Sequence, residues 1–227
     1  MEATATSEVE IRVVDEPWRV AGELIAEAAG AGGQIAVSGG SATGRAYAHA
    51  ARVQPRWTYA ELWWGDDRAV PPHDKASNYR LVRETLLDSL SSMPKQVHRI
   101  RGEKPAEEAA ALYDAELEGV TLDLALNGIG PDGHTASLFP NAPGLTETER
   151  RAIVAEPGLE PLVPRVTMTP PVFAAAALVV YLVLGEEKAD AVRRAFTEPP
   201  SPQTPASLIR GRQTLALLDA AAASNLS

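Results

Sequence analysis

The sequence predicts an α/β protein in which a mostly parallel sheet is covered by helices on both faces, within one domain over residues 1–227. Strand-like and helix-like segments alternate along the chain, as expected of strands joined by helical crossovers. The clearest strand, 177–184, is a nearly continuous apolar run, which is typical of a strand buried on both faces of a parallel sheet. Neither an internal repeat nor a shift in composition marks a second domain in the 227 residues.

The first half of the chain carries alternating strands and helices with recognisable ends. Asp15 is placed to cap the first helix, Pro17 suits its first turn, and a cluster of glycines follows it. In the third helix, apolar residues recur mostly every three or four positions, as on the buried side of an amphipathic helix. The expected strands are 9–14, 34–38, 60–64 and 98–101, and the expected helices are 16–29, 43–53, 77–90 and 105–117.

The second half continues the same alternation. A strand over 122–126 leads into a glycine-rich turn, and a loop with two prolines separates that turn from a strand over 152–155. Strand 177–184 is followed by a helix over 186–196. A proline-rich loop then precedes a short helix and a last strand around 215–218, which completes the predicted sheet.

Composition and charge exclude several classes of protein. The chain has 21 basic and 30 acidic residues, a net charge of -9, and no basic run, so no nucleic-acid partner is predicted. With no cysteine it has no disulfide, no thiolate nucleophile and no cysteine-bound zinc. No stretch approaches the roughly 18 apolar residues of a membrane helix, and the acidic N-terminus does not resemble a signal peptide. We therefore expect a cytoplasmic protein without a membrane partner.

Parallel sheets bind ligands beyond the carboxyl ends of their strands, so the turns at those ends are the places to search for a site. The turn 38–44, SGGSATG, follows a strand and opens a helix. Its glycines allow close approach of a ligand, and the helix start offers unpaired N–H groups to an anion. The same glycines also suit a plain corner, and the turn alone does not separate these two interpretations. It lacks the Lys-Ser/Thr pair of a phosphate-binding Walker loop.

The turn 128–133, GIGPDG, has the spacing of a dinucleotide-binding fingerprint. We reject that interpretation because Pro140 and Pro143 interrupt the helix that should follow the glycines. His134 comes directly after this turn, two residues beyond Asp132. A helix start disfavours imidazolium while a carboxylate favours it, so the pair suits a histidine that acts as a base near neutral pH.

Two further groups of charged or polar residues lie at the ends of predicted elements. Asp66, Asp67 and Arg68 follow the strand that ends at Trp64, where a solvated charged turn is the alternative interpretation. Ser77 and Asn78 are placed to cap a helix, a role that suffices to explain them.

Two more basic residues are candidates for holding an anion. Arg165 lies in a segment beside a strand, and Lys188 stands in the first turn of a helix, where a lysine opposes the helix dipole. In a chain this acidic, a phosphate site must be built from local bases, and Arg68, Arg165 and Lys188 are the candidates.

These residues carry a resemblance to the 6-phosphogluconolactonases, within the glucosamine/galactosamine-6-phosphate isomerase superfamily. It extends from about Ile35 to the C-terminus and is most specific in the segment 128–140, GIGPDGHTASLFP. The other matching segments, in the family's order, are Gly40-Ser41, 64–68 (WGDDR), 77–79 (SNY), Arg165-x-Thr167, Gly185-x-x-Lys188 and 205–207 (PAS). The sequence departs from the pattern at Asp67, where glutamate is usual, at Asn127, where apolar residues are common, and at Asn141, where glycine is frequent.

The resemblance implies hydrolysis of 6-phospho-D-glucono-1,5-lactone to 6-phospho-D-gluconate, the second step of the oxidative pentose phosphate pathway. It also implies a Rossmann-like fold related to sugar-phosphate isomerases and deaminases, with no metal, no cofactor and a monomeric state. By this resemblance His134 is the general base and Asp132 orients it. Arg68 and Asp66 lie near the reacting ring. The expected substrate- and phosphate-binding residues are Gly40, Ser41, Arg165, Lys188, Ser77 and Asn78.

Two alternative functions remain open at this stage. An amino-sugar-phosphate deaminase/isomerase has a similar Asp-Gly-His turn, but its catalytic acid beyond the histidine has no counterpart in 135–138. A phosphosugar-binding regulator usually carries a DNA-binding helix-turn-helix, and the segment before Ile35 is too short for one.

Overall fold

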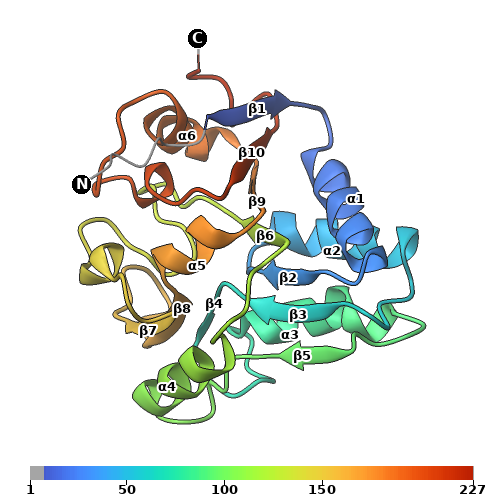
Figure 1. The fold of residues 1–227 in the computed structure, drawn as a ribbon. Coiled ribbons are helices and arrows are strands. Elements are labelled where there is room, and N and C mark those ends of the chain that lie inside the picture. Colours follow the sequence, from blue (N-terminus) through green and yellow to red (C-terminus); the bar gives the residue numbers. More distant parts are fainter. Residues whose placement is uncertain (1–7, 227) are drawn as a thin grey trace.

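Seven strands form the central sheet of the computed structural model, which describes residues 8–226 (Figure 1). Their order across the sheet is β1-β10-β9-β6-β2-β3-β5, and every neighbouring pair is parallel. The strands are β1 (Val9–Val13), β2 (Gln34–Val37), β3 (Glu61–Trp64), β5 (Gln96–His98), β6 (Leu124–Asn127), β9 (Leu178–Val183) and β10 (Gln213–Leu218). The predicted parallel sheet is confirmed; residues 1–7 and 227 of the predicted domain lie outside the described residues.

Helices lie on both sides of this sheet. α1 (Pro17–Gly30) and α2 (Ser41–Val53) pack against each other and against the central strands, whereas α5 (Pro170–Ala175) and α6 (Ala189–Phe196) lie on the opposite side in Figure 1. α3 (Asn78–Thr85) packs beside α2, and α4 (Ala106–Glu116) lies at the end of the molecule near β5. The helical layers predicted from the sequence are therefore present.

The strand order places a topological switch point between β2 and β6. From β2 the chain builds outward through β3 to β5, then returns to the other side of β2 with β6 and continues through β9 to β10. Helical connections consequently leave neighbouring strands in opposite directions, and a crevice opens beyond the carboxyl ends of β2 and β6. The turns 38–44 and 128–133 both lie at this crevice.

A second, smaller sheet was not predicted. β4 (Asp66–Arg68), β8 (Arg165–Met168) and β7 (Ala152–Ala155) form it with antiparallel pairing. Of these only β7 matches an expected strand. β4 was not expected because it is a run of three charged residues, which has the pattern of a solvated turn, and β8 was not among the expected strands either. The pairing of Arg68 with Arg165 across this sheet brings together two charged residues that lie far apart in the sequence.

Three local predictions about helix ends also need correction. The N-cap of α1 is Glu16 rather than Asp15, and no side chain caps this helix. The predicted helix 77–90 ends at Thr85 and is followed by a separate 3-10 turn, η1 (Leu87–Ser89). The predicted helix 186–196 begins as a 3-10 turn, η3 (Glu186–Lys188), so Lys188 precedes the α-helical residues.

Two buried tyrosines fix the chain at the carboxyl ends of β2 and β3. The Tyr47 hydroxyl accepts a hydrogen bond from the Ser38 N–H (2.8 Å) and donates one to the Ser38 carbonyl (2.7 Å). The Tyr113 hydroxyl does the same for Trp64, at 2.8 and 2.9 Å. Each phenol thus satisfies both backbone groups of a residue at which the strand ladder stops.

Removing one of these hydroxyls is expected to destabilise the fold. Tyr113→Phe leaves the N–H and carbonyl of Trp64 buried without partners, so the free energy of unfolding should fall by about 1–3 kcal/mol. Tyr59→Phe is the matched control, because Tyr59 is 76% exposed and its hydroxyl reaches water. Urea denaturation of both variants checks the prediction, and equal stabilities would contradict it.

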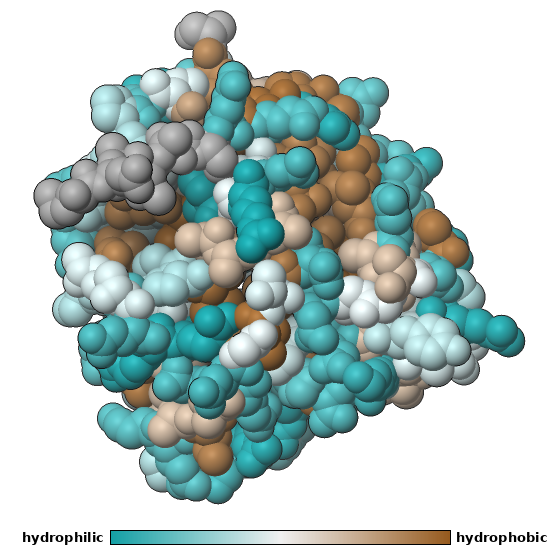
Figure 2. Space-filling view, viewed as in Figure 1, coloured by the Kyte–Doolittle hydropathy of each residue, from teal (hydrophilic) through white to brown (hydrophobic). Residues whose placement is uncertain are grey.

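One face of the molecule shows how polarity is distributed on its surface. In Figure 2 hydrophobic residues gather at the upper right, over β1, β10 and α1, and hydrophilic residues cover most of the lower part.

Among residues 8–226, no helix combines the length and apolar character that crossing a bilayer requires.

Candidate active site

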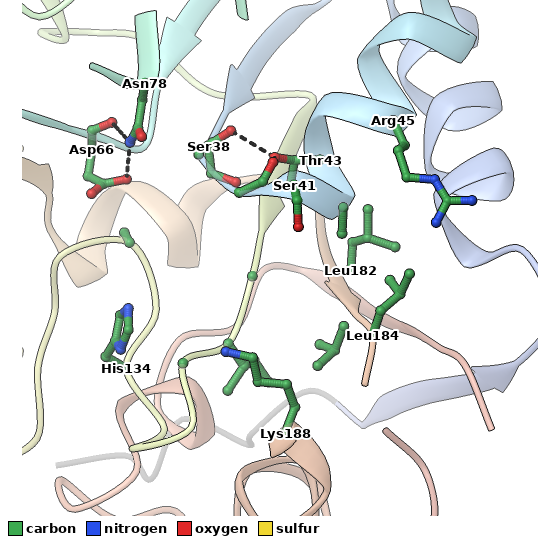
Figure 3. A pocket seen from close by; sticks show the side chains of 18 of the residues that line it. Ser38, Ser41, Thr43, Arg45, Asp66, Asn78, His134, Leu182, Leu184 and Lys188 are labelled. Atoms are coloured by element: carbon green, nitrogen blue, oxygen red, sulfur yellow. Dashed lines mark hydrogen bonds between the residues drawn. The ribbon is translucent and has the colours of Figure 1, made fainter. Parts of the chain in front are cut away.

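A cavity of about 430 Å³ lies beyond the carboxyl ends of β2, β3, β6 and β9 (Figure 3). We call it the strand-end cavity. Most of the residues predicted for the site line it: Gly40, Ser41, Asp66, Arg68, Asn78, His134, Arg165 and Lys188. Asp132 and Ser77 are not among its lining residues. The ends of four neighbouring strands and two strands of the small sheet, β4 and β8, therefore bring together segments from most of the chain.

The turn after β2 forms one wall and opens α2. Gly40 is the N-cap residue with φ of 125°, a conformation that side chains rarely adopt, and no side chain caps the helix. The first backbone N–H groups of α2 have no partner within the helix, which leaves them available to an anion. Gly39 is needed for a different reason: a Cβ there would lie 2.0 Å from Oδ1 of Asn78.

His134 stands in a tight turn, paired with Asp132. Its Nδ1 lies 2.6 Å from Oδ1 of Asp132, and its backbone N–H donates to the same oxygen at 3.1 Å. A Cβ at Gly130 would lie 2.0 Å from Nδ1 of His134, so this glycine makes room for the imidazole. Because Nδ1–H is used by Asp132, Nε2 is the nitrogen left to take a proton.

The predicted role of a helix dipole at His134 is wrong. The residues after His134 form turns, and the next helical segment is η2 (Pro143–Thr146), a short 3-10 turn. The electrostatics of the pair come instead from Asp132. Burial raises the pKa of this carboxyl, but the hydrogen bonds and charge of His134 outweigh burial and hold the pKa below its ordinary value. Asp132 therefore stays ionised beside the imidazole.

Asp66 is buried at the wall of the cavity with both carboxylate oxygens engaged. Ser137 donates its hydroxyl to Oδ2 at 2.6 Å, and the Asn78 amide donates to Oδ1 at 3.2 Å and to the Asp66 carbonyl at 2.9 Å (Figure 3 shows the Asn78 bonds). Thr167 in turn accepts the Ser137 N–H at 3.2 Å. This network fixes the orientation of Asp66.

Asp67 has a structural position that the sequence did not indicate. Its carboxylate accepts the backbone N–H groups of Asn78 and Tyr79, at 2.6 and 3.0 Å, and the hydroxyl of Ser77 at 3.1 Å. Ser77 also caps α3 by accepting the Arg80 N–H, as the sequence predicted. Burial raises the pKa of Asp67 to about 6, although these backbone bonds act in the opposite direction. Asp67 thus ties β4 to the start of α3.

Arg165 is a buried cation that has no carboxylate partner within residues 8–226. It is 3% exposed, its guanidinium donates to the Leu159 carbonyl at 2.8 Å, and its Nε has no hydrogen-bond partner in the same part of the chain. Burial, and then the neighbouring Arg68, lower the pKa of Arg165, which means that the surroundings disfavour its charge. An anion in the cavity would remove this penalty.

Three further basic residues line the cavity in the same unpaired state. Arg68 donates to the Ala76 carbonyl at 2.6 Å, and its Nε has no hydrogen-bond partner among the residues that the structure describes. Burial lowers the pKa of Lys188, although the charges of Glu187 and Asp132 raise it. Arg45, which sequence reasoning missed, lies at the rim with its guanidinium 4.5 Å from the centre of the Trp18 ring. Within 8–226 none of the four cavity cations forms an ion pair.

The arrangement joins a base to an anion site. Figure 3 shows His134 and Lys188 facing the same space as Ser38 and Ser41. Ser38, which was not predicted, is 4% exposed, and its hydroxyl makes no hydrogen bond within residues 8–226. Its position directly after a strand and before two glycines was the sequence signal by which Ser38 could have been found.

Among the described residues, no group of three or more histidine, cysteine, aspartate or glutamate side chains is arranged to hold a metal ion.

Comparison with known proteins identifies the family. The model of the family described as "Glucosamine-6-phosphate isomerases/6-phosphogluconolactonase" matches residues 7–217. The chain belongs to this family. Among its members, the 6-phosphogluconolactonase of Streptomyces coelicolor is 40% identical over 186 residues, which cover 75% of this chain and 71% of that protein. That of Mycobacterium tuberculosis is 33% identical over 225 residues, covering 92% and 91%.

Solved structures agree on the fold. A 6-phosphogluconolactonase from Trypanosoma cruzi has a TM-score of 0.79 and 27% identity, covering 98% of this chain and 98% of that one. A monomeric glucosamine-6-phosphate deaminase has a TM-score of 0.82 at 18% identity, covering 96% and 99%. The two activities of the family share this fold, so the fold alone does not separate them.

Proposed function

We propose that this protein hydrolyses 6-phospho-D-glucono-1,5-lactone to 6-phospho-D-gluconate. The observation that carries the proposal is the strand-end cavity, in which His134, paired with Asp132, faces a set of cations that form no ion pair among the described residues. Lactone hydrolysis needs a base for water and positive charge for the anions of substrate and transition state. The relatives at 33 and 40% identity, all named 6-phosphogluconolactonases, support the same reaction.

His134 is the proposed general base. Nε2 takes a proton from a water molecule, whose oxygen attacks the lactone carbonyl carbon. The ring C–O bond then breaks, and the imidazolium gives this proton to the ring oxygen, which becomes a hydroxyl, while the carboxylic acid that forms loses its own proton to solvent and becomes the carboxylate. Asp132 holds Nδ1–H and stabilises the imidazolium that forms. Asp66 and Arg68 lie near the reacting ring, and the guanidinium of Arg68 supplies positive charge where the carbonyl oxygen becomes negative.

Arg165 and Lys188 are the proposed phosphate ligands, with the backbone at Gly40 and Ser41. Neither cation forms an ion pair with a described carboxylate, and the N-terminus of α2 directs N–H groups to the same cavity. Asn78 supports the site through Asp66. Ser77 acts one step further away, as the cap of α3, because it does not line the cavity.

The competing function is deamination of an amino-sugar phosphate. The structure neighbour of that activity makes the comparison necessary, but residues 135–138 contain no acid beyond His134. The first acid downstream, Glu147, is bound to Arg150 and lies on another cavity. Deamination needs such an acid for ring opening and proton transfer, whereas lactone hydrolysis needs only water and one base.

Turnover of two substrates separates the activities. We expect acid release from freshly generated 6-phosphogluconolactone at neutral pH, well above the spontaneous rate, and no ammonia release from glucosamine 6-phosphate. A pH-stat measures the first and a coupled ammonia assay measures the second. Ammonia release without lactone turnover above the spontaneous rate would overturn the proposed function.

A further inference from the structure

A second cavity, of about 590 Å³, lies between α4 and the small sheet. We call it the rear cavity. Its walls are α4 around Ala110 and Asp114, the segment 137–147, and β7. Figure 1 shows α4 lying below β7 and β8, with the connection from β6 to β7 beside them. The rear cavity uses none of the residues proposed for catalysis or phosphate binding.

One short segment of chain separates the two cavities. Ala136 lines the strand-end cavity, whereas Ser137, Leu138 and Phe139 line the rear cavity. This segment, 136–139, is the wall between the cavities. Ala136 at its start and Asn141, two residues beyond Phe139, have φ of 49° and 58° and are the only non-glycine residues of 8–226 with positive φ. The packing on both sides must therefore hold the wall in place.

The wall also contacts the proposed catalytic groups directly. Ser137 donates its hydroxyl to Asp66 at 2.6 Å. The Phe139 ring lies 4.8 Å from the His134 imidazole, centre to centre, and 5.4 Å from the Arg165 guanidinium carbon. A molecule bound against Ser137 and Phe139 would press on the residues that orient Asp66 and His134.

The lining of the rear cavity defines the ligand that fits it. Its floor is apolar, formed by buried side chains that include Leu138, Phe139 and Ile153. Two lining acids are already bound: Asp114 accepts two backbone N–H groups, and Glu147 pairs with Arg150. The side chains of the other two, Glu107 and Glu156, have no hydrogen bond or ion pair among the described residues. The cavity thus combines apolar walls with two free negative charges, which repel phosphorylated sugars.

We propose that the rear cavity binds a small organic cation with an apolar body, and that its occupancy changes turnover in the strand-end cavity. The apolar body packs on Leu138, Phe139 and Ile153, and the positive group lies near Glu107 and Glu156. The chemistry is opposite in sign to that of the substrate, so the site is regulatory rather than a second substrate site.

Two indoles of matched size test the charge preference. Tryptamine carries an ammonium group and indole-3-propionate a carboxylate at neutral pH. We expect tryptamine to bind the full-length protein with one site and at least tenfold more tightly than indole-3-propionate, measured by calorimetry and saturation-transfer NMR. Glu107→Gln combined with Glu156→Gln should weaken tryptamine binding about fivefold. Glu118→Gln, which removes an exposed acid outside the cavity, should leave it unchanged.

A filling variant tests the location. Ala111 lies on the exposed side of α4 and lines the cavity, so Ala111→Trp should fold and should abolish tryptamine binding. In the wild type, saturating tryptamine should change kcat or KM for the lactone at least twofold, and Ala111→Trp should not respond. Equal binding of both indoles, or full binding to Ala111→Trp, would overturn the site, and binding without a kinetic effect would overturn the coupling. Because binding is measured without turnover, the outcome for the site is independent of the proposed function, whereas the coupling is read from lactone turnover and rests on that function.

Discussion

Replacing His134 with alanine is expected to lower kcat for 6-phosphogluconolactone by about a hundredfold or more, with the fold intact. The variant loses Nε2, the proposed acceptor of the proton from water. It also leaves Asp132 without the imidazole that now holds its pKa below the ordinary value. KM should change little, because the phosphate ligands are untouched. Initial rates by pH-stat, corrected for spontaneous opening of the lactone, provide the measurement.

His73→Ala is the matched control for this experiment. His73 is an exposed loop residue that does not line the strand-end cavity, so its loss should leave kcat unchanged. Circular dichroism and thermal unfolding of both variants confirm that the fold is retained. A His134→Ala enzyme with near-normal kcat and an intact fold would rule out His134 as the base.

The sequence predicted the parts of the fold that rest on strong local patterns. Continuous apolar runs such as 178–183 and glycine turns at strand ends are signals that tertiary context rarely changes, so the main sheet and the position of the site followed from them. The rule that ligands bind at the carboxyl ends of parallel strands then placed Gly40 and His134 in one cavity, as the structure does.

What the sequence missed depends on contacts between distant segments. β4 is a run of charged residues and becomes a strand only because β8, about a hundred positions later, pairs with it. Asp67 has the pattern of a surface acid, but the folded chain buries it against the start of α3. Arg45 is one of several helical arginines, and its place at the cavity is defined by packing on Trp18. No local pattern encodes these relations.

Arg165→Met is expected to lower kcat/KM for the phosphorylated lactone by about 10- to 100-fold, mainly through KM. A charge-assisted hydrogen bond to phosphate is worth about 1.5–3 kcal/mol and is made in both ground and transition states, so its loss weakens binding more than it slows the chemistry. For unphosphorylated gluconolactone the variant and the wild type should be equally efficient. The ratio of kcat/KM for the two lactones therefore measures what Arg165 contributes to recognition of the phosphate.

Stability provides an independent measurement of the same site, because Arg165 is buried and no carboxylate in the described part of the chain pairs with it. Inorganic phosphate should raise the Tm of the wild type by binding only the folded state, and should raise that of Arg165→Met much less. Arg151→Met is the matched control: Arg151 also donates to a backbone carbonyl and has an unpartnered buried Nε, but it lies outside the strand-end cavity. Its removal should lower Tm and leave both KM and the response to phosphate unchanged. If Arg165→Met retained the wild-type KM and the full phosphate response, the phosphate would have to be held by Lys188, Arg68 and the α2 N-terminus without it. The unpaired charge of Arg165 would then need another explanation.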